Sequence, residues 1–206
     1  MSPLTGRIDA AANGPTIRLP MRITRTRGAI VLVACALVSG ACKRKPQAPD
    51  IPALIADLKG ENAEKKGKAS LRLIEVGEPA GPALAEMMKS ENPAHRVTAA
   101  STLFGMGAKG RAAVPALAEA LDDPDLDLRV AAAMALESIG PDAAPAIPAL
   151  VTALKDKEGI VRQRAVIALG SIGPAAQSAI PALVEAGRWD AVRGHVDEAI
   201  ARIRAR

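Results

Sequence analysis

Aromatic side chains are nearly absent from this chain of 206 residues, which has no Tyr, one Phe and one Trp. Proteins that bind single-stranded nucleic acids stack bases on aromatic rings, and small-molecule pockets are usually lined by them. The scarcity argues against both kinds of site. Hydrophobic residues still make up 49% of the chain, so the core must consist of Ala, Leu, Ile and Val. Because Ala favours helices and is depleted in sheets, we expect an all-α fold.

Cysteine is equally scarce, and both cysteines, Cys35 and Cys42, lie in one N-terminal segment. In this segment an apolar run at 29–38 is followed by the small residues 39–41. Three basic residues precede the run: Arg22, Arg25 and Arg27. This order is typical of a secretory signal peptide. The run is too short for a membrane-spanning helix, which needs about 20 apolar residues.

The end of this segment resembles the lipobox of bacterial lipoproteins, in which small residues precede a cysteine that becomes lipidated. The resemblance implies lipidation at Cys42 and a membrane anchor in the bacterial cell envelope, facing the periplasm. Cleavage after Ala41 without lipidation is the alternative, and it would give a soluble periplasmic or secreted protein. We expect residues 21–42 to be the signal peptide and residues 1–20 to be an untranslated or disordered extension. Residues 43–50 contain three basic residues and two prolines, which predicts a short tether.

The net charge of +5 invites a nucleic-acid hypothesis, but most of this charge lies in the export segment. Residues 1–42 contain five Arg and one Asp, so the rest of the chain has 22 basic and 21 acidic residues. We therefore predict no nucleic-acid partner.

From residue 51 onward the sequence repeats itself. Pro-Ala-Leu recurs at intervals of 30, 33, 33 and 33 residues, beginning at Pro52, Pro82, Pro115, Pro148 and Pro181. Each unit combines a short apolar stripe after the proline, a polar turn and a second stripe, with apolar residues three and four positions apart. In the first four units the second stripe ends in Gly. This pattern predicts two helices per unit and five units, at about 51–80, 81–113, 114–146, 147–179 and 180–206. Period and pattern together indicate a helical solenoid.

The fourth unit carries the motif Ile147-Pro-Ala-Leu, then Val161-Arg162, then Ala168-Leu-Gly-Ser-Ile-Gly-Pro. This motif is similar to the HEAT-like repeats known as PBS-lyase HEAT repeats, and the resemblance covers residues 51–206. It implies an α-solenoid of about five HEAT-like helical hairpins. The fold mostly serves as a binding scaffold, and fold alone does not establish function.

A basic residue recurs at one position of every second helix. This basic column consists of Lys66, Arg96, Arg129, Arg162 and Arg193. In HEAT-like families the residue at this position usually bonds turn acids or carbonyls of the adjacent repeat, so the resemblance implies a structural role. A ladder of anion-binding sites is the alternative.

The second helices of such arrays typically line the binding face, so their outward residues are the candidate interaction surface. These residues are Thr98, Ser101, Phe104, Val130, Met134, Glu137, Gln163, Arg164 and Ile167, with Asp197 in the fifth unit. Among them, Phe104, Met134 and Ile167 occupy positions that the core stripe does not use. They could form an apolar docking patch or pack against neighbouring helices.

The sequence shows no grouping of residues that is typical of a catalytic or metal-binding site. The two histidines, His95 and His195, lie three repeats apart, and no Cys or His cluster could supply a zinc site. We predict no enzymatic activity, no cofactor and no metal, and expect an exported scaffold that binds a protein partner. Two alternatives stay open: an enzyme or subunit like the bilin lyases, which bind tetrapyrroles, and a cytoplasmic assembly factor.

Overall fold

The structure is a computed structural model that describes residues 49–188 and 192–205. The predictions for residues 1–42, the lipidation of Cys42 and most of the tether lie outside the described residues, as does Trp189. Residues 48–206 form one compact unit. The described parts of this unit are helical and contain no strand, which confirms the prediction of an all-α solenoid.

Each repeat folds as a helical hairpin. The first helices are α1 (Ile51–Lys59), α3 (Gly81–Met87), α5 (Val114–Ala120), α7 (Ile147–Ala153) and α9 (Ile180–Ala186). The second helices are α2 (Ala63–Val76), α4 (Pro93–Met106), α6 (Leu126–Ile139), α8 (Gly159–Ile172) and α10 (Arg193–Arg204). Short 3-10 helices join one hairpin to the next: η1 (Glu78–Ala80), η2 (Gly107–Ala113), η3 (Gly140–Ala146) and η4 (Gly173–Ala179).

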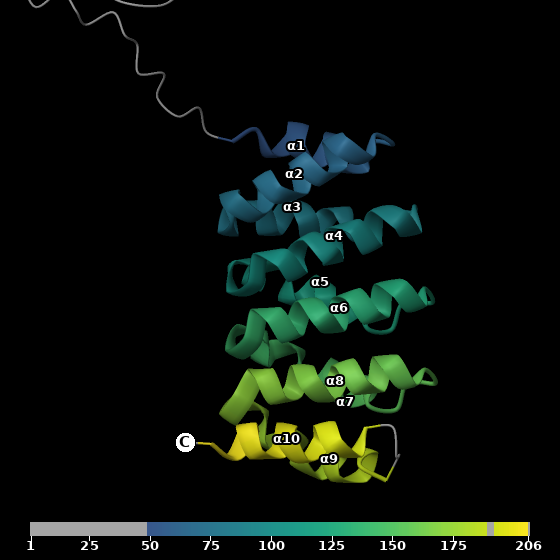
Figure 1. Ribbon diagram of the computed structural model, residues 1–206, viewed down its shortest axis with the longest axis vertical. Coiled ribbons are helices and arrows are strands. Elements are labelled where there is room, and N and C mark those ends of the chain that lie inside the picture. Colours follow the sequence, from purple (N-terminus) through teal and green to yellow (C-terminus); the bar gives the residue numbers. More distant parts are fainter. Residues whose placement is uncertain (1–48, 189–191, 206) are drawn as a thin grey trace, which may run out of the picture. The chain divides into compact units, whose positions relative to one another are not determined.

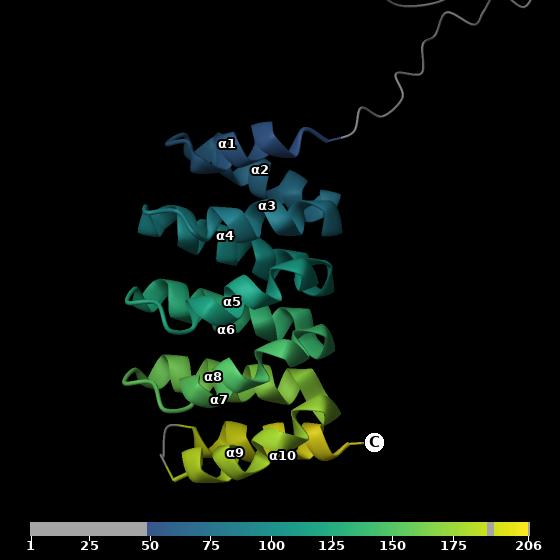
Figure 2. The same cartoon turned by 180° about the vertical axis from the view of Figure 1, so that it is seen from behind.

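The hairpins stack into two layers. The second helices lie side by side in one layer, which faces the viewer in Figure 1. The shorter first helices form the other layer, seen from the front in Figure 2. We call the layer of α2, α4, α6, α8 and α10 the second-helix layer.

Local sequence signals set the helix boundaries. Proline lies in the first turn of every first helix, where its missing N–H is not needed. In the third unit Asp125 caps α6 by accepting a hydrogen bond from the backbone N–H of Asp127. The second helices of the first four units end at Gly77, Gly107, Gly140 and Gly173, whose φ angles lie between 57° and 74°. Glycine adopts this left-handed backbone without strain.

The core runs continuously through the array. The repeated leucine of the second helix is fully buried in four successive units, as Leu73, Leu103, Leu136 and Leu169. Small residues surround it, such as Ala132 and Ala165, and they let neighbouring helices approach closely.

The stretch Gly159–Ala186 is long and apolar enough to pass a composition test for a membrane span. It folds as α8, η4 and α9, with a chain reversal at Gly173 between the two α-helices. Its apolar residues, such as Leu169 and Leu183, lie in the shared core, so the stretch is a core segment of the solenoid.

Candidate interaction surface

The basic column lies at the turn edge of the array, and Arg129 is its most buried member. Arg129 Nε donates to Asp156 Oδ2 at 2.9 Å, and Nη2 reaches the other carboxylate oxygen at 3.4 Å. Nη1 donates to the carbonyl oxygens of Asp123 and Pro124. The Arg129 and Asp156 side chains are only 6% and 11% exposed. The guanidinium therefore joins the turn of its own unit to the turn of the next.

Arg96 repeats part of this pattern one unit earlier. Its Nη2 donates to Asp123 Oδ1 at 3.1 Å, and Nη1 donates to the carbonyl oxygens of Ser90 and Glu91. Arg162 donates to the carbonyl oxygens of Asp156 and Lys157. Asp123 and Asp156 each accept from one arginine through the carboxylate and from the next through the backbone carbonyl.

The two end members of the column differ from Arg129 in exposure. Arg193 is exposed, and its Nε lies 3.5 Å from the carbonyl oxygen of Gly187. Lys66 is half-buried, and Ser90 stands where later units carry Asp123 and Asp156.

The candidate surface residues lie on the second-helix layer, and several link neighbouring helices. Arg164 Nη1 lies 3.6 Å from Glu137 Oε2, with both side chains about 30% exposed. Gln163 Nε2 and His195 Nε2 are 3.0 Å apart, a pair that the repeat pattern did not predict. Thr98 donates to a carbonyl of its own helix, Ser101 is exposed, and Val130 packs against the core.

The apolar candidates differ in exposure. Phe104 is 43% exposed, whereas Met134 and Ile167 are half-buried. Ser138 donates a hydrogen bond of 2.7 Å to the carbonyl oxygen of Phe104 and so links α6 to α4. The three side chains thus provide a modest apolar surface rather than a large exposed patch.

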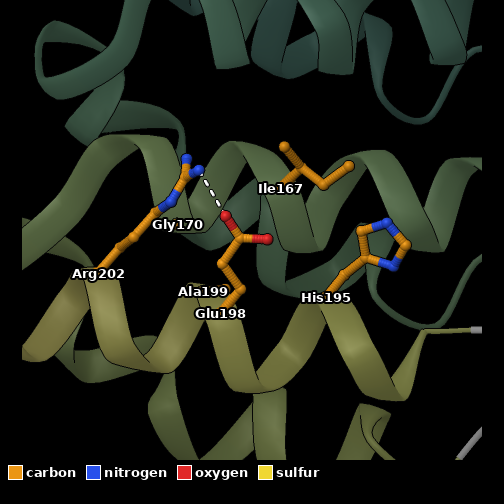
Figure 3. A pocket seen from close by; sticks show the side chains of 6 residues that line it. All are labelled: Ile167, Gly170, His195, Glu198, Ala199 and Arg202. Atoms are coloured by element: carbon orange, nitrogen blue, oxygen red, sulfur yellow. Dashed lines mark hydrogen bonds and ion pairs between the residues drawn. The ribbon is translucent and has the colours of Figure 1, made fainter.

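A hollow of about 90 Å³ lies between α8 and α10. Gly170 and Ala199 form its floor, Ile167 forms a wall, and His195, Glu198 and Arg202 surround it, with Glu198 paired to Arg202 (Figure 3). Gly170 occupies the position of Phe104 and Glu137 in earlier units, so no side chain fills the groove there. Our sequence analysis missed this hollow, although the glycine at a position otherwise held by large side chains is its signal.

Two larger grooves lie at the turn edge, of about 450 and 720 Å³. They occupy equivalent places in successive units, and Arg96 and Arg129 line one each. Lys89 lies at the rim of the smaller groove. Its hydrogen bond to Glu86, together with the charge of Glu86, raises the pKa of Lys89 above its usual value.

The histidines lie apart and each contacts the preceding unit. His95 Nε2 lies 3.1 Å from the carbonyl oxygen of Lys59, and His195 lies beside Gln163. In residues 49–188 and 192–205, no group of three or more His, Cys, Asp or Glu side chains is placed to hold a metal ion.

The repeated helical hairpins match a known family model. The model for HEAT repeats matches residues 51–137 and 114–201. The chain belongs to the HEAT-repeat family. No curated protein matches this HEAT-repeat chain.

Several solved structures share the fold. A chain from the complex of CpcE and CpcF of phycocyanin lyase, from Nostoc sp. PCC7120, is 25% identical with a TM-score of 0.59; the match covers 73% of this chain and 97% of that one. A designed armadillo repeat protein in complex with the peptide (KR)4 is 18% identical with a TM-score of 0.54, and 74% and 81% of the two chains are covered. An engineered protein is 21% identical with a TM-score of 0.53, with 75% and 81% covered.

Proposed function

We propose that this protein is a non-enzymatic HEAT-repeat scaffold, exported and lipid-anchored through Cys42, that binds a protein partner in the bacterial envelope. The partner binds the second-helix layer across α4, α6 and α8. The observation that carries this choice is the exposed Phe104 on the same layer as the open hollow beside Ile167. Apolar side chains set among paired charges are the usual composition of a binding surface that stays soluble without its partner.

The binding surface is tested by placing charge on it. Phe104→Asp, Met134→Asp and Ile167→Asp are combined in one variant, and crosslinking in cells followed by mass spectrometry compares its partners with those of the unchanged protein. We expect the specific crosslinks to be lost, because a carboxylate buried against an apolar partner surface is strongly unfavourable.

A matched control carries three substitutions at exposed residues of the first helices, outside this surface: Ala53→Asp on α1, Thr152→Asp on α7 and Val184→Asp on α9. The control should keep its partners. Retention of every crosslinked partner by the first variant, with its fold intact by circular dichroism, would contradict the proposed surface.

Anchoring is tested separately. Radiolabelled palmitate should enter the unchanged protein and not Cys42→Ser, and the variant should move from the membrane fraction to the soluble fraction. A phosphatase fused after Asp50 should be active outside the inner membrane, whereas an inactive fusion would favour a cytoplasmic assembly factor. If Cys42→Ser fractionates like the unchanged protein, the lipid anchor is wrong.

A second candidate is a bilin-lyase-like enzyme or subunit, favoured by the likeness to the phycocyanin lyase chain. The hollow of about 90 Å³ is far smaller than the 300–1,000 Å³ of usual small-molecule sites, so a tetrapyrrole would need one of the turn-edge grooves. Visible bilin absorbance in the protein purified from cells that make bilins would support this candidate.

A further inference from the structure

One position of the second helix faces the groove toward the next unit, and its side chain differs greatly in size along the array. The position holds Phe104 on α4, Glu137 on α6 and Gly170 on α8. A Cβ at Gly170 would lie 3.0 Å from Ala199 on α10, so the position faces the following second helix. Phe104 is 43% exposed, whereas Gly170 leaves the hollow of about 90 Å³. The same level of the second-helix layer therefore carries an exposed ring and, two units later, a hollow.

The hollow suits an apolar side chain. Ile167 forms a wall, and Gly170 and Ala199 form the floor (Figure 3). Glu198 and Arg202 at the rim pair with each other at 2.6 Å, so neither places an unpaired charge in the hollow. An enclosed cavity of about 150 Å³ holds a benzene molecule. This hollow is smaller and open to the surface, so it admits the edge of an aromatic ring.

A two-fold axis brings the ring and the hollow together. Phe104 faces the groove between α4 and α6, where Ser138 bonds its carbonyl oxygen, and the hollow lies between α8 and α10. The groove between α6 and α8 is midway between them in the stack (Figure 1). Rotation about an axis that follows this groove lays a second copy face to face on the layer, with α4 over α10 and α6 over α8. Phe104 of each copy then lies over the hollow of the other.

The helices that meet at the edges of this pair are complementary in size. On α10 the large side chains beside the hollow are His195, Glu198 and Arg202. The residues at the same levels on α4 are Thr98, Ser101 and Gly105. Small residues of one copy therefore face large residues of the other, and the Ser101 hydroxyl can donate to the Glu198 carboxylate. No acid faces an acid along these two helices, and no base faces a base.

The centre of the pair is apolar and its charges balance. Met134 on α6 and Ile167 on α8 hold the same position, so each faces the other across the two copies. Both side chains are half-buried in the single chain. The groove at the axis contains Glu137 and Arg164, whose Oε2 and Nη1 atoms are 3.6 Å apart. Two carboxylates and two guanidinium groups thus meet around the axis with no net charge, which is the electrostatic complementarity that a self-associating surface needs.

We propose that the partner of the second-helix layer is a second copy of this chain, and that Phe104 of each copy inserts into the hollow beside Gly170 of the other. This inference rests on the proposed binding surface and names its partner. Because the same patch is used by both copies, the pair is closed and leaves no equivalent surface for a third.

The association is tested on residues 48–206, which form one compact unit. Sedimentation equilibrium over a range of concentrations should give twice the mass of one unit. Loss of an aromatic side chain at a desolvated interface pocket weakens binding by about 30-fold or more. Phe104→Asp removes two such contacts by symmetry, so the dimer should weaken by about 1,000-fold.

Leu71→Asp is the matched control on the same layer. Leu71 is 64% exposed and lies on α2, which extends past the end of the second copy in this arrangement. This variant should keep the mass of the dimer. Circular dichroism checks that both variants are folded.

Disulfide formation tests how the two copies are arranged. Residues 48–206 contain no cysteine, so introduced cysteines react only with each other. A mixture of Met134→Cys and Ile167→Cys units should form a disulfide-linked dimer on oxidation faster than either variant alone, because these positions face each other across the copies. A mixture of Met134→Cys and Val184→Cys is the control, since Val184 lies on α9 in the other layer. It should form little linked dimer.

A monomer at every concentration would overturn the inference, as would equal weakening by Phe104→Asp and Leu71→Asp or equal disulfide formation in the two mixtures. Failure of the proposed function is distinguishable from these results. If the unit stays monomeric while the surface captures a different protein in cells, only the second copy is wrong. If the variant with three charges on the surface keeps every crosslinked partner, the proposed binding surface itself is wrong.

Discussion

The positions of the second helix that face the preceding unit carry different kinds of side chain in the interior units and in the first unit. Between units, these positions are occupied by small or apolar side chains such as Leu128 and Ala135, both almost fully buried. At the free end they are occupied by Lys65 and Arg72, both exposed. The helix is formed equally well in both places, so the difference lies in what each helix packs against. Repeat arrays need such polar ends to stay soluble.

The comparison also separates two kinds of ion pair. Arg129 and Asp156 link interior units and are nearly buried, whereas Arg72 and Glu75 lie on the end of the array and are more than 60% exposed. The first pair is surrounded by protein and backbone carbonyls, and the second is surrounded by water. A short distance between the charged atoms therefore does not by itself imply strong stabilisation.

The largest expected difference comes from the interior core. Leu136→Ala removes a fully buried side chain with units on both sides, so the lost burial and the remaining cavity should lower the free energy of unfolding by about 2–5 kcal/mol. Leu71→Ala on α2, where the side chain is 64% exposed, should change it by less than about 0.5 kcal/mol. Urea denaturation followed by circular dichroism measures both. Similar losses would mean that the first unit packs as tightly as the interior.

The interior ion pair gives the next effect. Arg129→Ala leaves the buried Asp156 carboxylate without its partner, and such breaks cost about 3–5 kcal/mol in full burial. Since Asp156 keeps some solvent contact and a bond from the Glu158 N–H, we expect about 2–3 kcal/mol and a clear fall in melting temperature. Arg111→Ala, whose pair with Glu78 is more than half exposed, serves as the control. An unchanged melting temperature combined with lost partner binding would instead favour the anion-binding alternative for the basic column.

The repeat period predicted much of this fold because each unit shows the same signals. Proline at the start of the first helix and glycine at the end of the second predicted the hairpins, and the structure has them at these places. The 3-10 helices such as η3 were not predicted, since the residues between Gly140 and Pro148 form no distinctive helical pattern. Their backbone is set by packing between the layers.

The site was harder to predict than the fold. The outward direction of Phe104 followed from helical spacing, and its exposure agrees with it. The hollow depends on the missing side chain at Gly170 and on the short distance between α8 and α10. A periodic pattern does not encode the distance between two helices. The outward direction of Lys65, Lys68 and Arg72 at the first unit required knowing which side of each helix faces the preceding unit.

A smaller effect is expected where α8 and α10 lie close together. A Cβ at Gly170 would lie 3.0 Å from both Cα and Cβ of Ala199. Backbone at that distance cannot move aside easily, and overpacking costs about 1–3 kcal/mol. Gly170→Ala also gains up to about 1 kcal/mol of helix propensity. We expect a net loss of about 1 kcal/mol, and a stabilised variant would show that α10 can shift away from α8.

The smallest effect should have the opposite sign, in the first unit. Gly67 lies within α2, and no atom lies within 4 Å of where its Cβ would be. Gly67→Ala therefore gains helix propensity without strain, which should stabilise α2 by about 0.5–1 kcal/mol. Hydrogen exchange of the α2 amides should slow while that of α8 stays constant, because units far apart are coupled only through their neighbours. Slower exchange throughout the array would show instead that the first unit and the interior unfold together, and the contrast between them would then be one of packing alone.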